Sequence, residues 1–222
     1  MIEVCTVYAP RTDHPEFRRD YLRLLKYQVR TAQHFEHSHT VVTDDPTLKV
    51  PEPSRVMQAK LPADLMRAMI AGVIERLKRP VTSPIVFVDV DVLIGLDLHG
   101  AFGGFDVGFT RRANDVSPIN NGAMYVSDAA KALPIFERAL SICGTHWGGD
   151  QEAISAALAP VPDHECIVER DGARIAFLSM ARHNCAPKMK GARHYQRPFV
   201  IHFKGKQAKE WMADYANAWI LY

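Results

Sequence analysis

Residues 84–95, PIVFVDVDVLIG, constrain the fold more than any other stretch of this sequence. The run Ile85–Val88 is apolar and rich in β-branched residues, and the chain becomes apolar again at Val92–Ile94. Such a run predicts a strand that is buried on both faces of a parallel sheet. We therefore expect an α/β domain in which this strand is central.

Two aspartates, Asp89 and Asp91, interrupt this apolar run. On extended backbone, residues two apart point to the same side, about 6–7 Å from each other. Two ionised carboxylates beside a buried strand destabilise the fold unless something neutralises them. One interpretation is a helix cap and a solvated turn residue. We favour a divalent cation at the carboxyl end of the strand, because no Lys or Arg lies nearby in sequence and open α/β sheets bind their ligands there.

The composition fits one domain. The chain has 222 residues, 47% of them hydrophobic, which is enough for one sizeable core, and a formal net charge of +2. This charge does not favour a duplex nucleic acid as partner. Four scattered cysteines without a CxxC pair predict reduced thiols in a cytoplasmic protein. The N-terminal residues suggest a strand and not a signal peptide, and no run of about 18 apolar residues predicts a transmembrane segment.

The rest of the sequence predicts alternating strands and helices. Strands are expected at 2–8, 39–43, 55–60, 105–110, 123–126, 166–169, 174–178 and 199–203. Helices are expected at 16–35, 62–78, 128–143, 152–158 and 208–220, and loops at 9–15 and over much of 161–197.

Three further polar motifs are expected to lie near the aspartates. Asn120-Asn121-Gly122 is a turn signal directly before a strand. Gly149-Asp150-Gln151 precedes a helix, so Asp150 is a candidate N-cap, a position that can also be catalytic. His202-Phe203-Lys204-Gly205-Lys206 ends a strand with a histidine and then two lysines around a glycine.

Other polar residues favour structural roles. His34, His37 and His39 straddle a helix end and a strand start, so we do not favour a zinc site there. Arg67 and Arg76 lie on one predicted helix, where either could reach a diphosphate or a solvated face. The C-terminal helix carries an apolar stripe that we expect to dock on the domain rather than on a membrane, made of Trp211, Met212, Tyr215 and Trp219.

The order and spacing of the four polar motifs resemble the GT-A glycosyltransferases, nucleotide-sugar enzymes with a DxD motif, and among them glycosyltransferase family 8 and its relatives. The resemblance covers roughly residues 1–211 and rests on FVDVDVLI, NNGAMYV and the C-terminal His-x-x-Gly. The sequence departs from the family in two places. After Gly205 it is one residue longer and lacks the proline before Trp211, so either Lys206 or Lys209 could meet a diphosphate. The first strand ends in Tyr8-Ala9-Pro10 instead of an acidic turn.

The resemblance implies a single GT-A (Rossmann-like) domain over residues 1–222, with a mixed, mostly parallel sheet flanked by helices. A nucleotide-binding half would span 1–110, an acceptor and catalytic half 111–205, and a C-terminal helix 206–222. The implied activity is metal-dependent transfer of a sugar from a nucleotide diphosphate donor, with UDP expected, to a carbohydrate or other hydroxyl acceptor. Mn²⁺ or Mg²⁺ would be the cofactor. Retention of configuration is weakly favoured over inversion.

The resemblance also assigns roles to individual residues. Asp91 and His202 would bind the metal, and Asp89 the metal or the ribose. Asp150 and Gln151 would lie near the anomeric carbon, and Asp150 would be the general base if the enzyme inverts. The nucleotide or diphosphate would contact Tyr8, Ala9, Thr43, Asp44, Arg67, Val90, Lys204, Gly205 and Lys206, and the sugar or acceptor Asn120, Asn121, Gly122 and Gly149.

Two other functions remain open. A haloacid-dehalogenase-type phosphatase also uses a strand followed by Asp-x-Asp, with the first aspartate as nucleophile. That motif normally follows the first strand, and here Ile154 stands where its distal acidic motif needs a second carboxylate. The third possibility is a non-catalytic module that binds nucleotide sugars. A module without catalytic activity would have little reason to retain buried charged residues, because they lower the stability of the fold.

Overall fold

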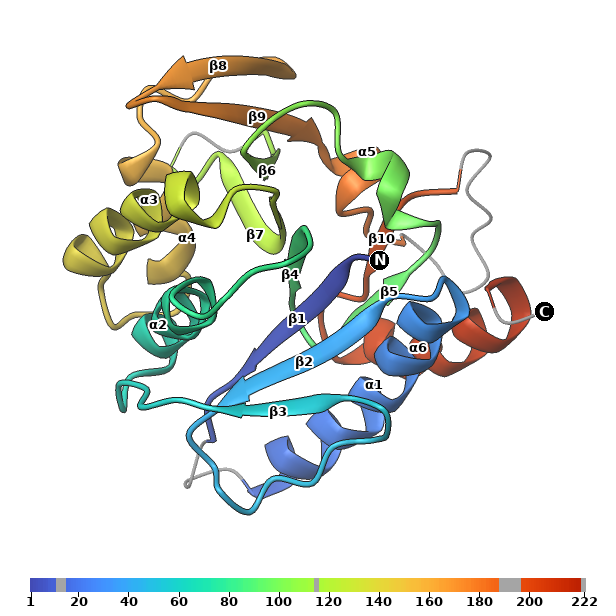
Figure 1. Ribbon diagram of the computed structural model, residues 1–222. Coiled ribbons are helices and arrows are strands. Elements are labelled where there is room, and N and C mark those ends of the chain that lie inside the picture. Colours follow the sequence, from blue (N-terminus) through green and yellow to red (C-terminus); the bar gives the residue numbers. More distant parts are fainter. Residues whose placement is uncertain (11–14, 114–115, 188–196, 221–222) are drawn as a thin grey trace.

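The computed structural model of the chain describes residues 1–10, 15–113, 116–187 and 197–220 (Figure 1). The strands are β1 (Glu3–Tyr8), β2 (Ser38–Thr43), β3 (Arg55–Gln58), β4 (Ile85–Val88), β5 (Val92–Ile94), β6 (Val107–Arg111), β7 (Ile119–Val126), β8 (Cys166–Arg170), β9 (Ala173–Ser179) and β10 (Val200–His202). The helices are α1 (Pro15–His34), α2 (Leu65–Leu77), α3 (Ala129–Ile142), α4 (Gly149–Ala157), α5 (Met180–His183), α6 (Lys206–Trp219) and the short 3₁₀ helix η1 (Leu98–Ala101). The predicted loops at 9–15 and 161–197 lie partly outside the described residues, as does the side chain of Trp219.

One sheet has the strand order β3-β2-β1-β4-β7-β6-β9-β8. The pairs β2–β3, β1–β2, β1–β4 and β6–β9 are parallel. The strand β7 runs antiparallel to both of its neighbours, β4 and β6, and β8 runs antiparallel to β9. The mixed, mostly parallel sheet confirms the predicted fold class.

Helices cover both faces of this sheet (Figure 1). All four residues of β4 are buried, as the apolar run predicted. Ile85 and Phe87 face the core under α2, α3 and α4, whereas Val86 and Val88 belong to a second core on the opposite face. That face is covered by α1 and by the strands β5 and β10, and α6 packs against these elements from outside. The buried side chains of Met212 and Tyr215 confirm that the described part of the C-terminal helix docks on the domain.

After β4 the chain leaves the main sheet. Val90 and Asp91 form a turn, so the prediction of extended backbone through the two aspartates is wrong. The following strand, β5, pairs antiparallel with β10, with Val92 opposite His202. This two-stranded ribbon brings the C-terminal histidine to the aspartates.

Two other local predictions need correction. Asn120-Asn121-Gly122 lies inside β7 and is not a turn, because β7 pairs with both β4 and β6 in this region. Asp150 is not the N-cap of its helix, because α4 begins at Gly149 and Gly148 occupies the cap with a φ of 87°. Asp128 does cap α3 as predicted, since its side chain accepts from the backbone N–H of Lys131.

The second predicted helix is shorter than expected. The helix α2 begins at Leu65 instead of Pro62, and the Asp64 side chain caps it by accepting from Arg67 N at 3.0 Å. Arg76 is buried and pairs with Glu3 on β1, so it is neither solvated nor near the aspartates in the structure. All four cysteines are free thiols. Within the described ranges, no helix has both the length and the hydrophobicity to span a bilayer.

Candidate active site

The site is built around the turn that follows β4. Asp89 N donates to Gly122 O at 3.2 Å, and Asp89 O accepts from Gln28 Nε2 at 2.7 Å. Gln28 is fully buried on α1, and its Oε1 accepts from Thr6 Oγ1 at 2.7 Å and from His39 Nε2 at 2.9 Å. Strands β1, β2 and β7 together with α1 therefore fix the backbone of Asp89.

Asp89, Asp91 and His202 bring their side chains together. His202 Nε2 lies 3.5 Å from Asp89 Oδ2 and 3.3 Å from Asp91 Oδ1. The three side chains each offer one ligand atom, and these atoms lie within 4.8 Å of one another. The backbone closes the arrangement, because Phe203 N donates to Asp91 O at 2.8 Å. The predicted convergence of these three residues is confirmed.

The two carboxylates have different environments. Burial raises the pKa of Asp89 to about 6, although the charge of His202 opposes this and the charges of Asp91 and Asp150 add to it. Burial also raises the pKa of Asp91, but the hydrogen bond and charge of His202 and the ammonium of Lys209 outweigh it and hold that pKa at about 2. The turn therefore holds two carboxylates close together, that of Asp91 10% exposed and that of Asp89 35% exposed.

The residues fit a hard divalent cation. Two carboxylates and one imidazole, with room for water or phosphate oxygens, match Mn²⁺ or Mg²⁺ better than a closed zinc site. The ammonium group of Lys209 already lies beside the carboxylates, with Nζ 2.9 Å from Asp91 Oδ2. Part of the negative charge of the two aspartates is therefore balanced by a residue of α6.

The predicted lysines lie beside this cluster. Lys204 follows β10 and reaches the surface, yet the surrounding protein partly desolvates it and lowers its pKa, an effect that Arg112 reinforces and Asp89 and Asp91 oppose. Gly205, with a φ of 80°, precedes α6, which begins at Lys206. Of Lys206 and Lys209, Lys209 contacts Asp91, while the choice between them as the lysine that meets a diphosphate stays a prediction.

A second polar group lies at the start of α4. Asp150 is 6% exposed, and its Oδ2 accepts from Asn121 Nδ2 at 2.5 Å. Burial raises the pKa of Asp150, against the effect of Asn121 and of the N–H groups of Gln151 and Asp150 itself. Among the described residues, neither Asp150 Oδ1 nor Gln151 Oε1 has a hydrogen-bond partner of good geometry. Buried acceptors without partners need a ligand or water to satisfy them.

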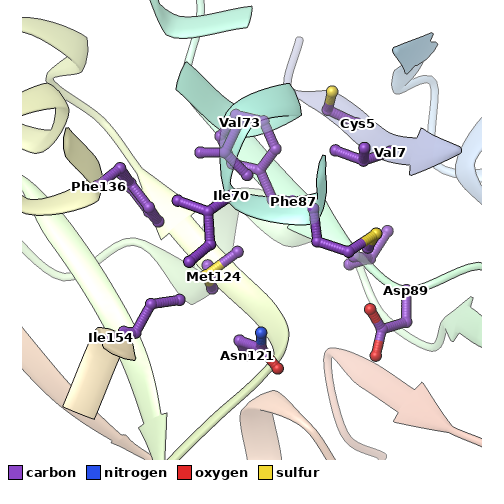
Figure 2. A pocket seen from close by; sticks show the side chains of 12 residues that line it. Cys5, Val7, Ile70, Val73, Phe87, Asp89, Asn121, Met124, Phe136 and Ile154 are labelled. Carbon is purple, nitrogen blue, oxygen red and sulfur yellow. The ribbon is translucent and has the colours of Figure 1, made fainter. Parts of the chain in front are cut away.

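Figure 2 shows Asp89 and Asn121 at one end of a small cavity whose other labelled side chains are apolar apart from Cys5. Ile70 and Val73 of α2 form part of the wall, as do Phe87 and Met124 of the sheet. The cavity holds about 20 Å³, close to the room that one water needs. It is far too small for a hexose. The apolar wall borders Asp89, whose side chain is nevertheless 35% exposed.

The predicted nucleotide residues follow the same edge of the sheet. Tyr8 and Ala9 lie at the end of β1, and Thr43 and Asp44 at the end of β2, beside the carboxyl end of β4. Thr43 is fully buried and its Oγ1 accepts from Asp45 N at 3.0 Å. Arg67 lies on α2, where its guanidinium donates to Cys143 O at 3.4 Å. Their contacts with a nucleotide, like that of Val90 in the aspartate turn, stay predictions.

Three predicted sugar-binding residues have packing roles in the structure. A side chain on Gly122 would place its Cβ 2.3 Å from Nδ1 and Cε1 of His202. A Cβ on Gly149 would lie 2.6 Å from the backbone oxygen of Gly144. Asn120 is 2% exposed, and its Oδ1 accepts from Gly122 N. In the described residues, the amide of Asn121 contacts Asp150 and that of Asn120 does not. Contacts of Asn120, Asn121, Gly122 and Gly149 with a sugar stay predictions.

Sequence reasoning missed two buried residues that support the site. Gln28 falls within the predicted helix 16–35 and Asn184 within the predicted loop region 161–197, and the sequence predicts no role in the site for either. Asn184 is fully buried, and its Oδ1 lies 3.0 Å from His202 Nδ1. Both side chains are uncharged and belong to no local motif. The sequence therefore did not indicate their roles, which depend on partners that are distant in sequence.

A further group of ligand-type side chains contains His37, Asp97 and His99. His37 Nε2, the atom that faces this group, accepts from Leu98 N at 3.1 Å. Burial lowers the pKa of His37 to about 4. Because the free electron pair of Nε2 is already used, these contacts fit a structural role better than a metal site.

Comparison with known proteins places this geometry in a known fold. The sequence matches no family model and no curated protein. Among solved structures, a glycosyltransferase involved in the glycosylation of the major capsid of PBCV-1 matches with a TM-score of 0.57 and 14% identity over 96% of this chain and 98% of that chain. The galactosyltransferase LgtC, in complex with donor and acceptor sugar analogs, matches with a TM-score of 0.56 and 12% identity over 98% and 96%. The glycosyltransferase GlyE of Streptococcus pneumoniae TIGR4 matches with a TM-score of 0.59 and 9% identity over 97% of this chain and 61% of that chain.

These likenesses confirm the predicted GT-A fold. The cluster at the carboxyl end of β4 therefore lies where an open α/β sheet is expected to bind its ligand.

Proposed function

We propose that this protein is a metal-dependent glycosyltransferase that moves a sugar from a nucleotide diphosphate donor, with UDP expected, to a hydroxyl acceptor. The observation that carries the proposal is the cluster of Asp89, Asp91 and His202, with Asp150 close enough for its charge to raise the pKa of Asp89. A group of side chains that could hold a cation thus lies near a buried carboxylate whose Oδ1 has no well-placed hydrogen-bond partner among the described residues.

Asp89, Asp91 and His202 would hold Mn²⁺ or Mg²⁺, which when bound would neutralise the charge that develops on a departing diphosphate. The chain supplies further positive charge. Lys204 and Lys206 flank Gly205, whose lack of a side chain lets a phosphate approach the backbone. Lys209 can exchange Asp91 for a phosphate oxygen, because a lysine is a flexible point charge.

The base and ribose would lie along the carboxyl ends of β1 and β2. Tyr8, Ala9, Thr43 and Asp44 are located there, and Arg67 and Val90 lie on the adjoining α2 and aspartate turn. On this proposal residues 1–110 form the nucleotide-binding half and residues 111–205 the acceptor and catalytic half, with 206–222 as a C-terminal helix.

Asp150 and Gln151 would face the transferred sugar. Asp150 Oδ1 and Gln151 Oε1 are buried acceptors without a well-placed partner among the described residues, so sugar hydroxyls would satisfy them. The amide of Asn121 orients Asp150 from the other side. In the retaining course that we favour, Gln151 borders the β-face of the sugar and Asp150 holds its hydroxyls. In an inverting course, Asp150 would take the proton of the acceptor hydroxyl.

The structure does not favour the phosphatase alternative. Its nucleophile would follow the first strand, whereas Asp89 follows β4. The overall fold is also that of GT-A proteins. The non-catalytic module remains the contrasting outcome of the experiment.

A ligand panel read by thermal denaturation tests the proposal. Nucleoside diphosphates and nucleotide sugars are added with Mn²⁺ or with EDTA. A ligand at 100 times its Kd adds about 2.7 kcal/mol of stability, which raises the Tm by several degrees. We expect a shift with one nucleotide class that EDTA removes, and slow hydrolysis of the matching donor sugar. NMR of the released sugar's first-formed anomer then distinguishes retention from inversion. A metal-linked shift without any hydrolysis or transfer would indicate the binding module, and no metal-linked shift would refute the proposal.

A further inference from the structure

The orientation of His202 follows from a chain of hydrogen bonds that begins at the backbone of β7. Gly122 N can only donate, and it lies 3.1 Å from the side chain of Asn120, so the Asn120 atom facing it must be the oxygen Oδ1. The same oxygen lies 3.0 Å from the side chain of Asn184. Asn184 must therefore present its NH₂ group to Asn120.

A second contact supports this assignment. Thr110 Oγ1 donates its proton to the backbone oxygen of Asn120 at 2.6 Å, so only its electron pairs remain for Asn184, 3.0 Å away. Both partners on this side of Asn184 are acceptors. Its Nδ2 must face them, and its Oδ1 must face His202 Nδ1 at 3.0 Å.

An oxygen acceptor facing Nδ1 requires a proton on that nitrogen. The other ring nitrogen, Nε2, lies 3.5 Å from Asp89 Oδ2 and 3.3 Å from Asp91 Oδ1. With Nδ1 kept protonated, Nε2 is the atom that can give up its proton and offer its electron pair when a cation binds the two carboxylates. Backbone pairing holds the two side chains in place, because His202 N donates to Cys185 O at 2.8 Å and Cys185 N donates to Val200 O at 2.9 Å.

We propose that Asn184 is the positioning residue that fixes His202 in the Nδ1–H form, so that Nε2 is ready to bind a divalent cation together with Asp89 and Asp91. This inference rests on the metal centre of the proposed function, yet the ring protonation can be measured without metal. The polar chain is fully buried: Thr110 and Asn184 are 0% exposed and Asn120 is 2% exposed. Water therefore cannot replace a lost partner easily, and the chain acts as one unit.

The first measurement is long-range ¹H–¹⁵N NMR of histidine-labelled protein, without metal and with Mg²⁺. The His202 signals are assigned by their loss in His202→Gln. We expect Nδ1 of wild-type His202 to carry a proton in both samples, and Mg²⁺ to leave Nε2 without one. In Asn184→Leu the oxygen that accepts from Nδ1 is gone, and we expect Nδ1 to lose its proton while Nε2 keeps one, which Asp91 accepts.

The second measurement is the Kd for Mn²⁺ alone, by calorimetry. Loss of a residue that orients a metal ligand typically costs about 10- to 100-fold in metal affinity, and we expect this for Asn184→Leu. Asn184→Asp keeps an oxygen for Nδ1–H and should retain the Nδ1–H form, but its second oxygen faces Asn120 Oδ1 and Thr110 Oγ1 and should lower the stability of the fold. Ser155→Ala is the matched control. It removes a buried hydrogen bond to Ile119 N on β7, the strand that also carries Asn120, and leaves the chain of hydrogen bonds from Gly122 to His202 intact.

The outcomes separate the two proposals. A wild-type ring without a proton on Nδ1 overturns the inference whatever the metal does, and it does so even if Asn184→Leu fails to fold. Unchanged ring protonation and unchanged Mn²⁺ affinity in folded Asn184→Leu overturn it as well. A wild type in the Nδ1–H form that binds no Mn²⁺ supports the role of Asn184 but refutes the metal centre.

Discussion

The contact between Gly122 and His202 gives the sharpest test of the site. In Gly122→Ala the new Cβ would lie 2.3 Å from Cε1 and Nδ1 of the imidazole. Carbon atoms in contact need about 3.5 Å, so the ring has to retreat by about 1.2 Å. Gly122 lies within β7, which pairs with β4 on one side, so the backbone cannot easily yield.

The retreat affects both ring nitrogens. A shift of this size would break the 3.0 Å contact of Nδ1 with Asn184 and move Nε2 away from the two aspartates. Overpacking of a well-packed interior typically costs about 1–3 kcal/mol of stability. Displacing an oriented ligand should weaken Mn²⁺ binding by about 10- to 100-fold, equivalent to about 1.4–2.7 kcal/mol.

Calorimetric titration with Mn²⁺ and urea denaturation measure the two effects separately. Gly103→Ala is the control, since a Cβ there meets nothing within 4 Å, and we expect it to behave as wild type. A Gly122→Ala protein with wild-type stability and wild-type Mn²⁺ affinity would show that His202 does not need this space, and the geometric reasoning would fail.

Three further predictions test other features of the structure. Asp91→Asn should leave the fold intact but weaken Mn²⁺ binding and abolish donor-dependent turnover, and a folded variant with full activity would remove the metal claim. Burial lowers the pKa of His39 from 6.5 to about 3, so between these values only the unfolded chain takes up the proton. Its contribution to stability is complete above about pH 6.5 and falls by up to about 1.4 kcal/mol per pH unit on acidification, and urea titrations of wild type and His39→Gln should differ in this slope. Arg76→Met leaves Glu3 as an unpaired buried charge, which should cost about 3–5 kcal/mol in urea denaturation, and the double variant Arg76→Met/Glu3→Leu should recover much of that loss.

The parts of the fold that depend on local pattern could be predicted from the sequence. The run Ile85–Val88 is apolar at every position because helices cover both faces of β4, and this signal identified the centre of the sheet. Asp89 and Asp91 stood out for the complementary reason, since charged residues inside such a run need a partner. The predicted order of strands and helices also placed the motifs around Asp150 and His202 at the edge of the sheet where the two aspartates lie.

Where the sequence was misleading, tertiary contacts outweighed local preference. Asn120-Asn121-Gly122 has the composition of a turn, yet two neighbouring strands hold it extended and bury most of it. The role of Asn184 depends on Asn120 and Thr110, which lie 64 and 74 positions away, and on the bulge in β6 next to Thr110. No local pattern encodes such contacts. Lys209 likewise reaches Asp91 only because α6 packs beside the ribbon of β5 and β10.

The pairing of β5 with β10 also determines at which stage of chain synthesis the site can form. It joins residues 92–94 to residues 200–202, so a chain still being synthesised presents Asp89 and Asp91 long before His202 has left the ribosome. Until β10 pairs with β5, the aspartate turn has neither its imidazole nor the ammonium of Lys209. A nascent chain would therefore carry two uncompensated carboxylates next to a forming core until the two ends of the domain have come together.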